Sequence, residues 1–120
     1  MNSRIIRILL SAILMLIAPF AVEAQAAAHS VVLQWVDSTN PATTTWNVYR
    51  SPNACPMSSP TKLTNVNVKT YTDTAVVSGA TYCYTVRAMY SGSESVDSNT
   101  AQALVPVDAV PPTGLTVTIK

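Results

Sequence analysis

Short runs of alternating apolar and polar residues recur along the chain from residue 31 onward, and this is the period of a β-strand. The longest run covers residues 81–90, and shorter runs cover 31–35, 45–50, 62–64 and 69–73, with a last one ending near Val105. Clusters rich in Pro, Ser, Asn and Gly separate the runs. The pattern predicts an all-β sandwich. The core residues that the strand phase predicts are Trp35, Trp46, Val48, Tyr82, Tyr84 and Val86.

Residues 1–24 have the layout of a secretory signal peptide. Arg4 and Arg7 give the start a positive charge, residues 8–18 are apolar, and small residues follow around two predicted cleavage points, after Ala24 and after Ala26. The alternative is a membrane anchor, but this apolar run is shorter than the ~20 residues that a spanning helix needs. We therefore predict a secreted protein, periplasmic or extracellular, with no membrane attachment after cleavage.

The charges that remain after residue 24 balance. The basic residues are Arg50, Lys62, Lys69, Arg87 and Lys120, and the acidic residues are Asp37, Asp73, Glu94, Asp97 and Asp108. Nucleic-acid binders need a basic face, and these scattered charges supply none. The sequence therefore disfavours nucleic acid and acidic lipid surfaces as partners.

Catalytic and metal chemistry also lack their residues. The single histidine, His29, stands at the start of the predicted mature chain, where we expect it to be exposed and frayed. A Ser-His-Asp triad needs an oriented imidazole, and a zinc site needs several His, Cys or carboxylate ligands. The acidic residues read as turn and edge positions, and Asp37 with Glu94 falls short of the about six oxygens of a calcium site. We expect no enzyme activity and no cofactor.

Several motifs together resemble the fibronectin type III family, most closely the type found in bacterial secreted proteins. They are Leu33-Gln-Trp35, Trp46-Asn-Val-Tyr-Arg-Ser51, Tyr71-Thr-Asp73, Gly79-Ala-Thr-Tyr-Cys-Tyr-Thr-Val-Arg-Ala88, Glu94-Ser95 and Ser98-Asn99. The resemblance covers residues 29–106. It implies an immunoglobulin-like β-sandwich of two antiparallel sheets. The strands implied are 30–36, 44–51, 61–65, 69–74, 81–90 and 95–105.

The resemblance also implies two structural roles and one departure. Trp35 resembles the family's core tryptophan, and Tyr82 its corner tyrosine, whose hydroxyl would bond to the backbone near Ala75 to Ser78. The family's first strand, A, has no good counterpart here. Residues 107–120 instead resemble a linker and the first strand of a further domain, so that this chain carries a spare strand at its C-terminal end.

The two cysteines, Cys55 and Cys83, form an even pair in a chain that we expect to be exported, which favours a disulfide over two separate thiols. The family topology supports this pairing, because it brings the loop after the 44–51 strand close to the start of the 81–90 strand. In that topology Cys83 lies on the outward face of its strand.

The candidate binding surface consists of outward strand positions and polar loops. Tyr49 and Arg87 fall on the outward phase, where they could stack on a sugar or a protein partner, or simply cap the sheet. The loops 38–44 and 91–95 are small and polar, as recognition loops and ordinary turns both are. The loop candidates are Ser38, Asn40, Ser93 and Glu94.

These observations favour a non-enzymatic secreted or cell-surface module that contacts a protein or glycan. The alternatives are a structural unit that assembles through its C-terminal strand and a stand-alone accessory module of a carbohydrate-active enzyme. Leu115, Val117 and Ile119 alternate with threonines, so residues 113–119 are a candidate for self-association by strand donation. The alternatives for this tail are a disordered remnant and a strand folded back on its own molecule.

Overall fold

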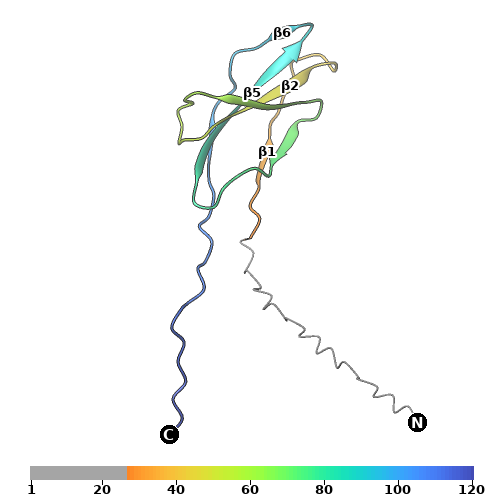
Figure 1. The fold of residues 1–120 in the computed structure, drawn as a ribbon. Coiled ribbons are helices and arrows are strands. Elements are labelled where there is room, and N and C mark those ends of the chain that lie inside the picture. Colours follow the sequence, from red (N-terminus) through yellow and green to blue (C-terminus); the bar gives the residue numbers. More distant parts are fainter. Residues whose placement is uncertain (1–26) are drawn as a thin grey trace, which may run out of the picture.

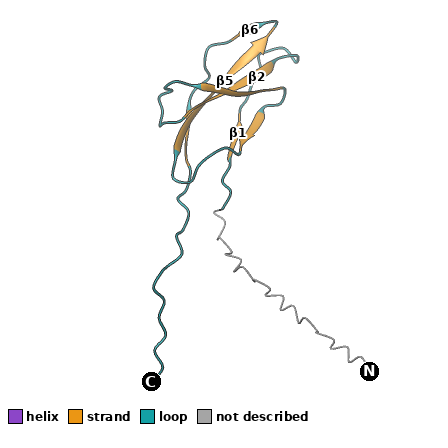
Figure 2. Cartoon of the chain, in the orientation of Figure 1, coloured by secondary structure: helices purple, strands orange, loops and turns teal. Residues whose placement is uncertain are grey.

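The structure, a computed structural model, describes residues 27–120. The predicted signal peptide, residues 1–24, lies outside this range. The described chain forms strands and no helix (Figures 1 and 2). The strands are β1 (Val31–Gln34), β2 (Thr45–Ser51), β3 (Thr61–Val66), β4 (Thr70–Asp73), β5 (Thr81–Tyr90), β6 (Ser93–Glu94) and β7 (Ala101–Leu104). Within residues 27–120, no helix is long and apolar enough to cross a membrane.

The strands form two antiparallel sheets, as the resemblance to the fibronectin type III family implied. The smaller sheet contains β1 and β4. The larger sheet has the order β3-β2-β5, and β5 pairs with β7 along its first half and with β6 along its second half. The two sheets therefore differ greatly in width, and the short β1–β4 pair covers only part of the larger sheet.

The core between the sheets centres on Tyr82, Tyr84 and Val105, and the partly buried Val31 and Leu33 of β1 pack against it. Trp46 and Val48 of the predicted core are buried as well. Trp35 and Val86, which were also predicted as core residues, are buried only in part. Both line an open side of the sandwich, because the smaller sheet does not reach over them.

The corner tyrosine is present. The backbone N–H of Val77 donates a hydrogen bond of 3.1 Å to the Tyr82 hydroxyl, within the stretch that the sequence predicted. The next turn contains Gly79 with φ +74°, a left-handed conformation that favours glycine. Its N–H donates to the Val105 carbonyl at 3.1 Å. These contacts fix the crossover from β4 to β5 against the segment that follows β7.

Cys55 and Cys83 form a disulfide, with their Cα atoms 5.0 Å apart. Cys83 is fully buried although it lies on the outward phase of β5, because the loop that carries Cys55 covers it. The N–H of Cys55 also donates to the Gln102 side-chain oxygen in β7 at 3.0 Å. The bridge therefore fastens the long loop after β2 across β5 and β7.

The last predicted strand, residues 95–105, is interrupted. Residues 93–94 form β6 and 101–104 form β7, with an irregular segment between them. In this segment the hydroxyl oxygens of Ser95 and Ser98 accept hydrogen bonds from the N–H groups of Ala88 and Val86 at 2.9 and 3.0 Å. In a regular pair of strands, backbone carbonyls would accept from these N–H groups. Here the segment advances three residues, from Ser95 to Ser98, while β5 moves back two, from Ala88 to Val86. The regular pattern of backbone hydrogen bonds is therefore lost.

Two polar residues are more buried than the sequence predicted. Asp73 does stand at the end of β4, where it accepts a hydrogen bond from the Ala75 N–H, but its side chain is 1% exposed and lies between the sheets. His29 was expected to be exposed and frayed, yet its Nε2 lies 2.7 Å from the Asp108 carboxylate and its side chain is 21% exposed. The His29–Asp108 contact also shows that β1 begins at the same end of the sandwich where the C-terminal tail leaves (Figure 1).

Candidate functional site

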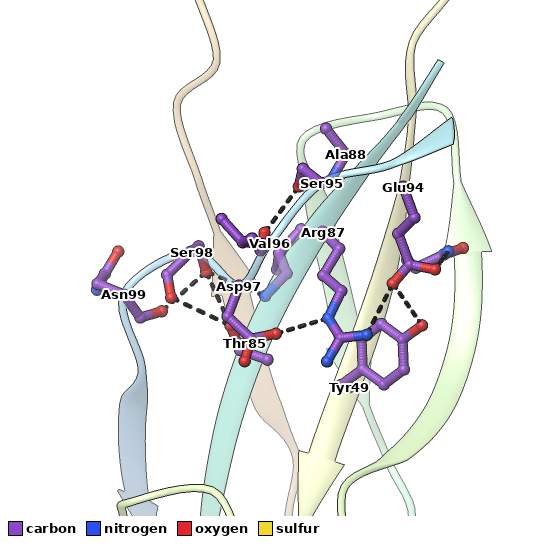
Figure 3. A network of polar contacts seen from close by, with 12 residues as sticks. Tyr49, Thr85, Arg87, Ala88, Glu94, Ser95, Val96, Asp97, Ser98 and Asn99 are labelled. Atoms are coloured by element: carbon purple, nitrogen blue, oxygen red, sulfur yellow. Dashed lines mark hydrogen bonds and ion pairs between the residues drawn. The ribbon is translucent and has the colours of Figure 1, made fainter. Parts of the chain in front are cut away.

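The outer face of the larger sheet carries a connected group of polar side chains centred on Glu94 (Figure 3). Its carboxylate accepts a hydrogen bond of 2.7 Å from the Tyr49 hydroxyl and one of 3.0 Å from Arg87 Nη1, both at Oε1. The Arg87 guanidinium lies over the Tyr49 ring, 4.4 Å from its centroid. We call Tyr49, Arg87, Glu94 and the neighbouring Asp97 the outer-face cluster.

The strand pairing explains why these side chains meet. Tyr49 lies opposite Thr85 and is therefore diagonal to Arg87 on the same face of β2 and β5. Ser91 and Gly92 both have positive φ and form the two-residue turn between β5 and β6, which suits a tight hairpin. This hairpin places Glu94 opposite Met89. Ser93 and Glu94 therefore belong to a strand and not to the predicted loop.

Hydrogen bonds extend the cluster in both directions along the sheet. Arg87 Nε donates to Asp97 at 2.6 Å, and Asn47 Nδ2 donates to the second oxygen of Glu94 at 3.3 Å. Asn65 of β3 in turn donates to the Asn47 side-chain oxygen at 2.8 Å. Asn47 is 2% exposed although it lies on the outward phase, because these neighbours cover it. The network thus holds side chains from four strands in one arrangement.

Hydrogen bonds within the cluster favour the charged forms of Glu94 and Arg87. The hydrogen bond from Tyr49 lowers the pKa of Glu94, with a further contribution from Arg87. The same bond raises the pKa of Tyr49, so that the phenol stays protonated and donates. Hydrogen bonds to Asp97 and then to Glu94 raise the pKa of Arg87. The shifts of Glu94, Tyr49 and Arg87 therefore favour the protonation states that make these hydrogen bonds.

The other predicted binding residues, Ser38 and Asn40, lie in the loop between β1 and β2, at the same end of the sandwich as the β5–β6 turn. Asn40 donates both its N–H and its side-chain amide to Asp37, at 3.1 and 2.7 Å, and Trp46 Nε1 donates to Asp37 at 3.0 Å. Hydrogen bonds from the Asn40 side chain and then its backbone hold the pKa of Asp37 at about 2. Asp37 therefore organises this loop, and it forms a network of its own.

An open apolar cleft of about 640 Å³ lies between β1 and the segment that joins β6 to β7. Sequence reasoning missed it, because it arises from the separation of the two sheets. Trp35 lines the cleft, and its indole Nε1 is buried without a hydrogen-bond partner. The apolar residues along the cleft include Leu33, Trp35, Val36, Trp46, Val86 and Val96, and polar residues such as Asp37 and Asp97 also line it.

Within residues 27–120, no group of three or more His, Cys, Asp or Glu side chains lies close enough together to hold a metal ion. Asp37 and Glu94, the pair considered from the sequence, each satisfy their oxygens with separate protein donors.

Comparisons with known proteins identify the fold. No protein-family model matches the chain, and no curated protein matches it. A solved structure that resembles it is the solution structure of a fibronectin type III (FNIII) domain of human origin, the fourth of its protein. That domain is 14% identical, with a TM-score of 0.58, and the match covers 77% of this chain and 78% of that one. The similarity establishes that this chain has an FNIII-like fold, an immunoglobulin-like β-sandwich.

Proposed function

We propose that this chain is a non-enzymatic interaction module of the bacterial secreted type, which binds a protein partner through the outer-face cluster. FNIII-like domains are commonly binding modules and are typically not catalytic. The Cys55–Cys83 disulfide supports an oxidising compartment, since such bonds are rare in reducing ones. A periplasmic or extracellular location agrees with the predicted signal peptide.

The observation that carries this proposal is the preorganised state of the cluster. Arg87 and Glu94 are each 30% exposed, while hydrogen bonds and stacking fix their positions. Tyr and Arg are the residue types most enriched where binding energy concentrates, because they combine apolar area with polar groups. A partner that meets side chains already held in place loses less conformational entropy on binding.

The geometry favours a protein over a glycan. A sugar that stacks on an aromatic ring needs a free ring face, and the Arg87 guanidinium occupies one face of Tyr49. The Tyr49 hydroxyl is already bonded to Glu94. An acidic or amide-bearing protein surface can instead contact the outer edge of Arg87 without breaking the cluster.

The test is a binding assay with immobilised protein. It compares which proteins and glycans from the envelope of the source cell are retained by the wild type and by two variants. Immobilised wild-type protein is compared with Tyr49→Ala/Arg87→Ala and with the control Thr72→Ala, an exposed position on the smaller sheet. We expect a protein that wild type and the control retain and the double variant loses. A glycan lost in the same way would redirect the proposal to sugars. Identical retention by all three folded proteins would refute the cluster as the binding surface.

A further inference from the structure

The outer edge of β1 offers unpaired backbone groups. Within residues 27–120, β4 is the one strand that pairs with β1. The N–H of Trp35 donates to Lys69 at 3.2 Å, so residues 31, 33 and 35 direct their backbone groups toward β4. Because alternate residues of a strand point to opposite sides, Val32 and Gln34 direct their N–H and C=O groups away from β4. Such an edge can accept a further strand.

The apolar cleft lies beside this same edge. Its lining comes from β1 and the following residues 35–37, from β2 and β5, and from residues 95–101, and none of it comes from β4, which occupies the other edge of β1. Leu33 and Trp35 are only partly buried there. The buried Trp35 Nε1 without an acceptor marks the same region, since buried donors are normally hydrogen-bonded. The edge and the cleft together form an incomplete side of the sandwich.

The C-terminal tail has the pattern of a strand that would complete it. Leu115, Val117 and Ile119 are 94%, 85% and 91% exposed, so the tail does not bury them in its own molecule. They alternate with Thr116 and Thr118, which is the pattern of a strand with one buried and one solvated face. Residues 115–119 carry no charge, which suits insertion into an apolar cleft.

We propose that residues 115–119 of a second copy of this chain add as an antiparallel strand to the free edge of β1. In the register that matches the two patterns, Leu115 lies opposite Trp35, Val117 opposite Leu33 and Ile119 opposite Val31. This register turns the three apolar side chains toward the cleft, because residues opposite each other share a face. It also sets Thr116 and Thr118 opposite Gln34 and Val32, the residues with free backbone groups.

The donor is a second copy because the tail is directed away from its own β1. The tail leaves the sandwich at the end where β1 begins, beside the His29–Asp108 contact (Figure 1). To reach its own β1, the tail would have to reverse between residues 109 and 114, and the strand would then run parallel to β1. Pro111 and Pro112 oppose that reversal, since consecutive prolines hold the chain extended.

The antiparallel direction determines the form of the assembly. The tail must enter its neighbour at the end remote from that neighbour's own termini and run toward them. Each molecule then donates at one end and accepts along one edge, so the contact is heterologous and continues from molecule to molecule, as an open chain or, where the rotation between neighbours closes, as a ring. The expected assembly is a head-to-tail chain. Parallel pairing would place two tail-bearing ends together and would give closed dimers.

The experiment measures mass against concentration for the full exported protein by sedimentation and light scattering. We expect the weight-average mass of the wild type to rise beyond twice the monomer mass. Leu115→Asp/Val117→Asp should remain monomeric, whereas the matched control Thr116→Asp/Thr118→Asp, with the same added charge on the solvated face, should still assemble. On the acceptor side, Gln34→Pro removes a free-edge N–H and should block assembly, while Gln34→Ala should not.

A second experiment measures strand addition directly, as the binding of a peptide, without a variant that blocks assembly. Protein that lacks residues 113–120 is titrated with a peptide of residues 111–120 while tryptophan emission is followed. We expect the emission to shift to shorter wavelength, because the peptide would cover Trp35, and the same peptide with Val117→Asp should cause no shift. A wild type that stays monomeric, assembly that survives tail removal, or a truncated protein that ignores the peptide would overturn the proposal. A mass that levels off at the dimer would overturn the antiparallel direction.

Discussion

Arg50 and Asp73 form a partly buried ion pair that joins the two sheets of the sandwich. Arg50 Nη1 of β2 lies 2.7 Å from Asp73 Oδ2 at the end of β4. The same carboxylate oxygen accepts a hydrogen bond of 2.9 Å from the Tyr84 hydroxyl, and the other oxygen accepts one from the Ala75 N–H at 3.0 Å. Burial and then the bond to Asp73 raise the pKa of Tyr84, which keeps this hydroxyl a donor.

Replacement of Asp73 should therefore cost far more stability than replacement of a surface acid. Asp73→Ala removes a buried acceptor that serves three donors, and loss of one partner of a buried pair costs about 3 kcal/mol. The matched control is Asp97→Ala, whose carboxylate is 43% exposed and pairs with Arg87. Exposed pairs contribute about 1 kcal/mol or less. Urea unfolding of both variants provides the comparison, and equal losses would contradict the inter-sheet role of Asp73.

The disulfide should contribute a comparable amount. Cys55 and Cys83 are separated by 28 residues, and closure of a loop of this size stabilises a fold by roughly 3–4 kcal/mol through the unfolded chain. Reduction, or Cys55→Ala/Cys83→Ala, should lower the denaturant midpoint accordingly. Thiol labelling of the freshly isolated protein without reductant should find no free cysteine. Two labelled thiols would show that the pair stays open in the cell.

The strands with regular alternation could be predicted from the sequence. Residues 81–90 were predicted as one strand and form β5 with the same bounds, since Tyr82, Tyr84, Val86 and Ala88 recur at every second position. The corner role of Tyr82 and the pairing of Cys55 with Cys83 followed from the resemblance to a family fold. These features depend on local pattern or on a shared topology, both of which a single sequence carries.

The features that could not be predicted from the sequence depend on contacts between distant segments. Asp73 stands in a turn-like motif, and only the approach of Arg50 from the other sheet explains why a carboxylate can be buried there. The cleft beside Trp35 depends on how far the smaller sheet reaches over the larger one. Tyr49 and Arg87 were placed on one surface by strand phase, but the hairpin that brings Glu94 between them was read as a loop.

Ser95 and Ser98 supply a test of the interrupted last strand. Their hydroxyls accept the N–H groups of Ala88 and Val86, so Ser95→Ala/Ser98→Ala should leave these two amides without a partner. Each lost hydrogen bond should cost about 1 kcal/mol. Hydrogen exchange should accelerate at Val86 and Ala88 before it changes elsewhere in β5. Ser93→Ala, at an exposed position of β6, serves as the control and should leave both rates unchanged.

Asp37 should make the fold sensitive to acid over a defined range. Its pKa is about 2 in the folded protein, against 3.8 for an ordinary aspartate, mainly because Asn40 donates to it. Since the folded-state pKa is the lower one, the carboxylate stabilises the fold fully above about pH 4, and this contribution disappears as the pH falls toward 2. Thermal unfolding followed by circular dichroism should show the melting temperature of the wild type falling across this range. Asp37→Asn should have a lower melting temperature than the wild type at pH 7. Its melting temperature should fall less on acidification, because its amide does not titrate. The pKa of Glu94 is also lowered, so Glu94→Gln is the informative control: it should retain the part of the acid response that belongs to Asp37. If Asp37→Asn and the wild type follow parallel curves from pH 7 to pH 2, then the Asp37 turn does not hold its carboxylate in the charged form.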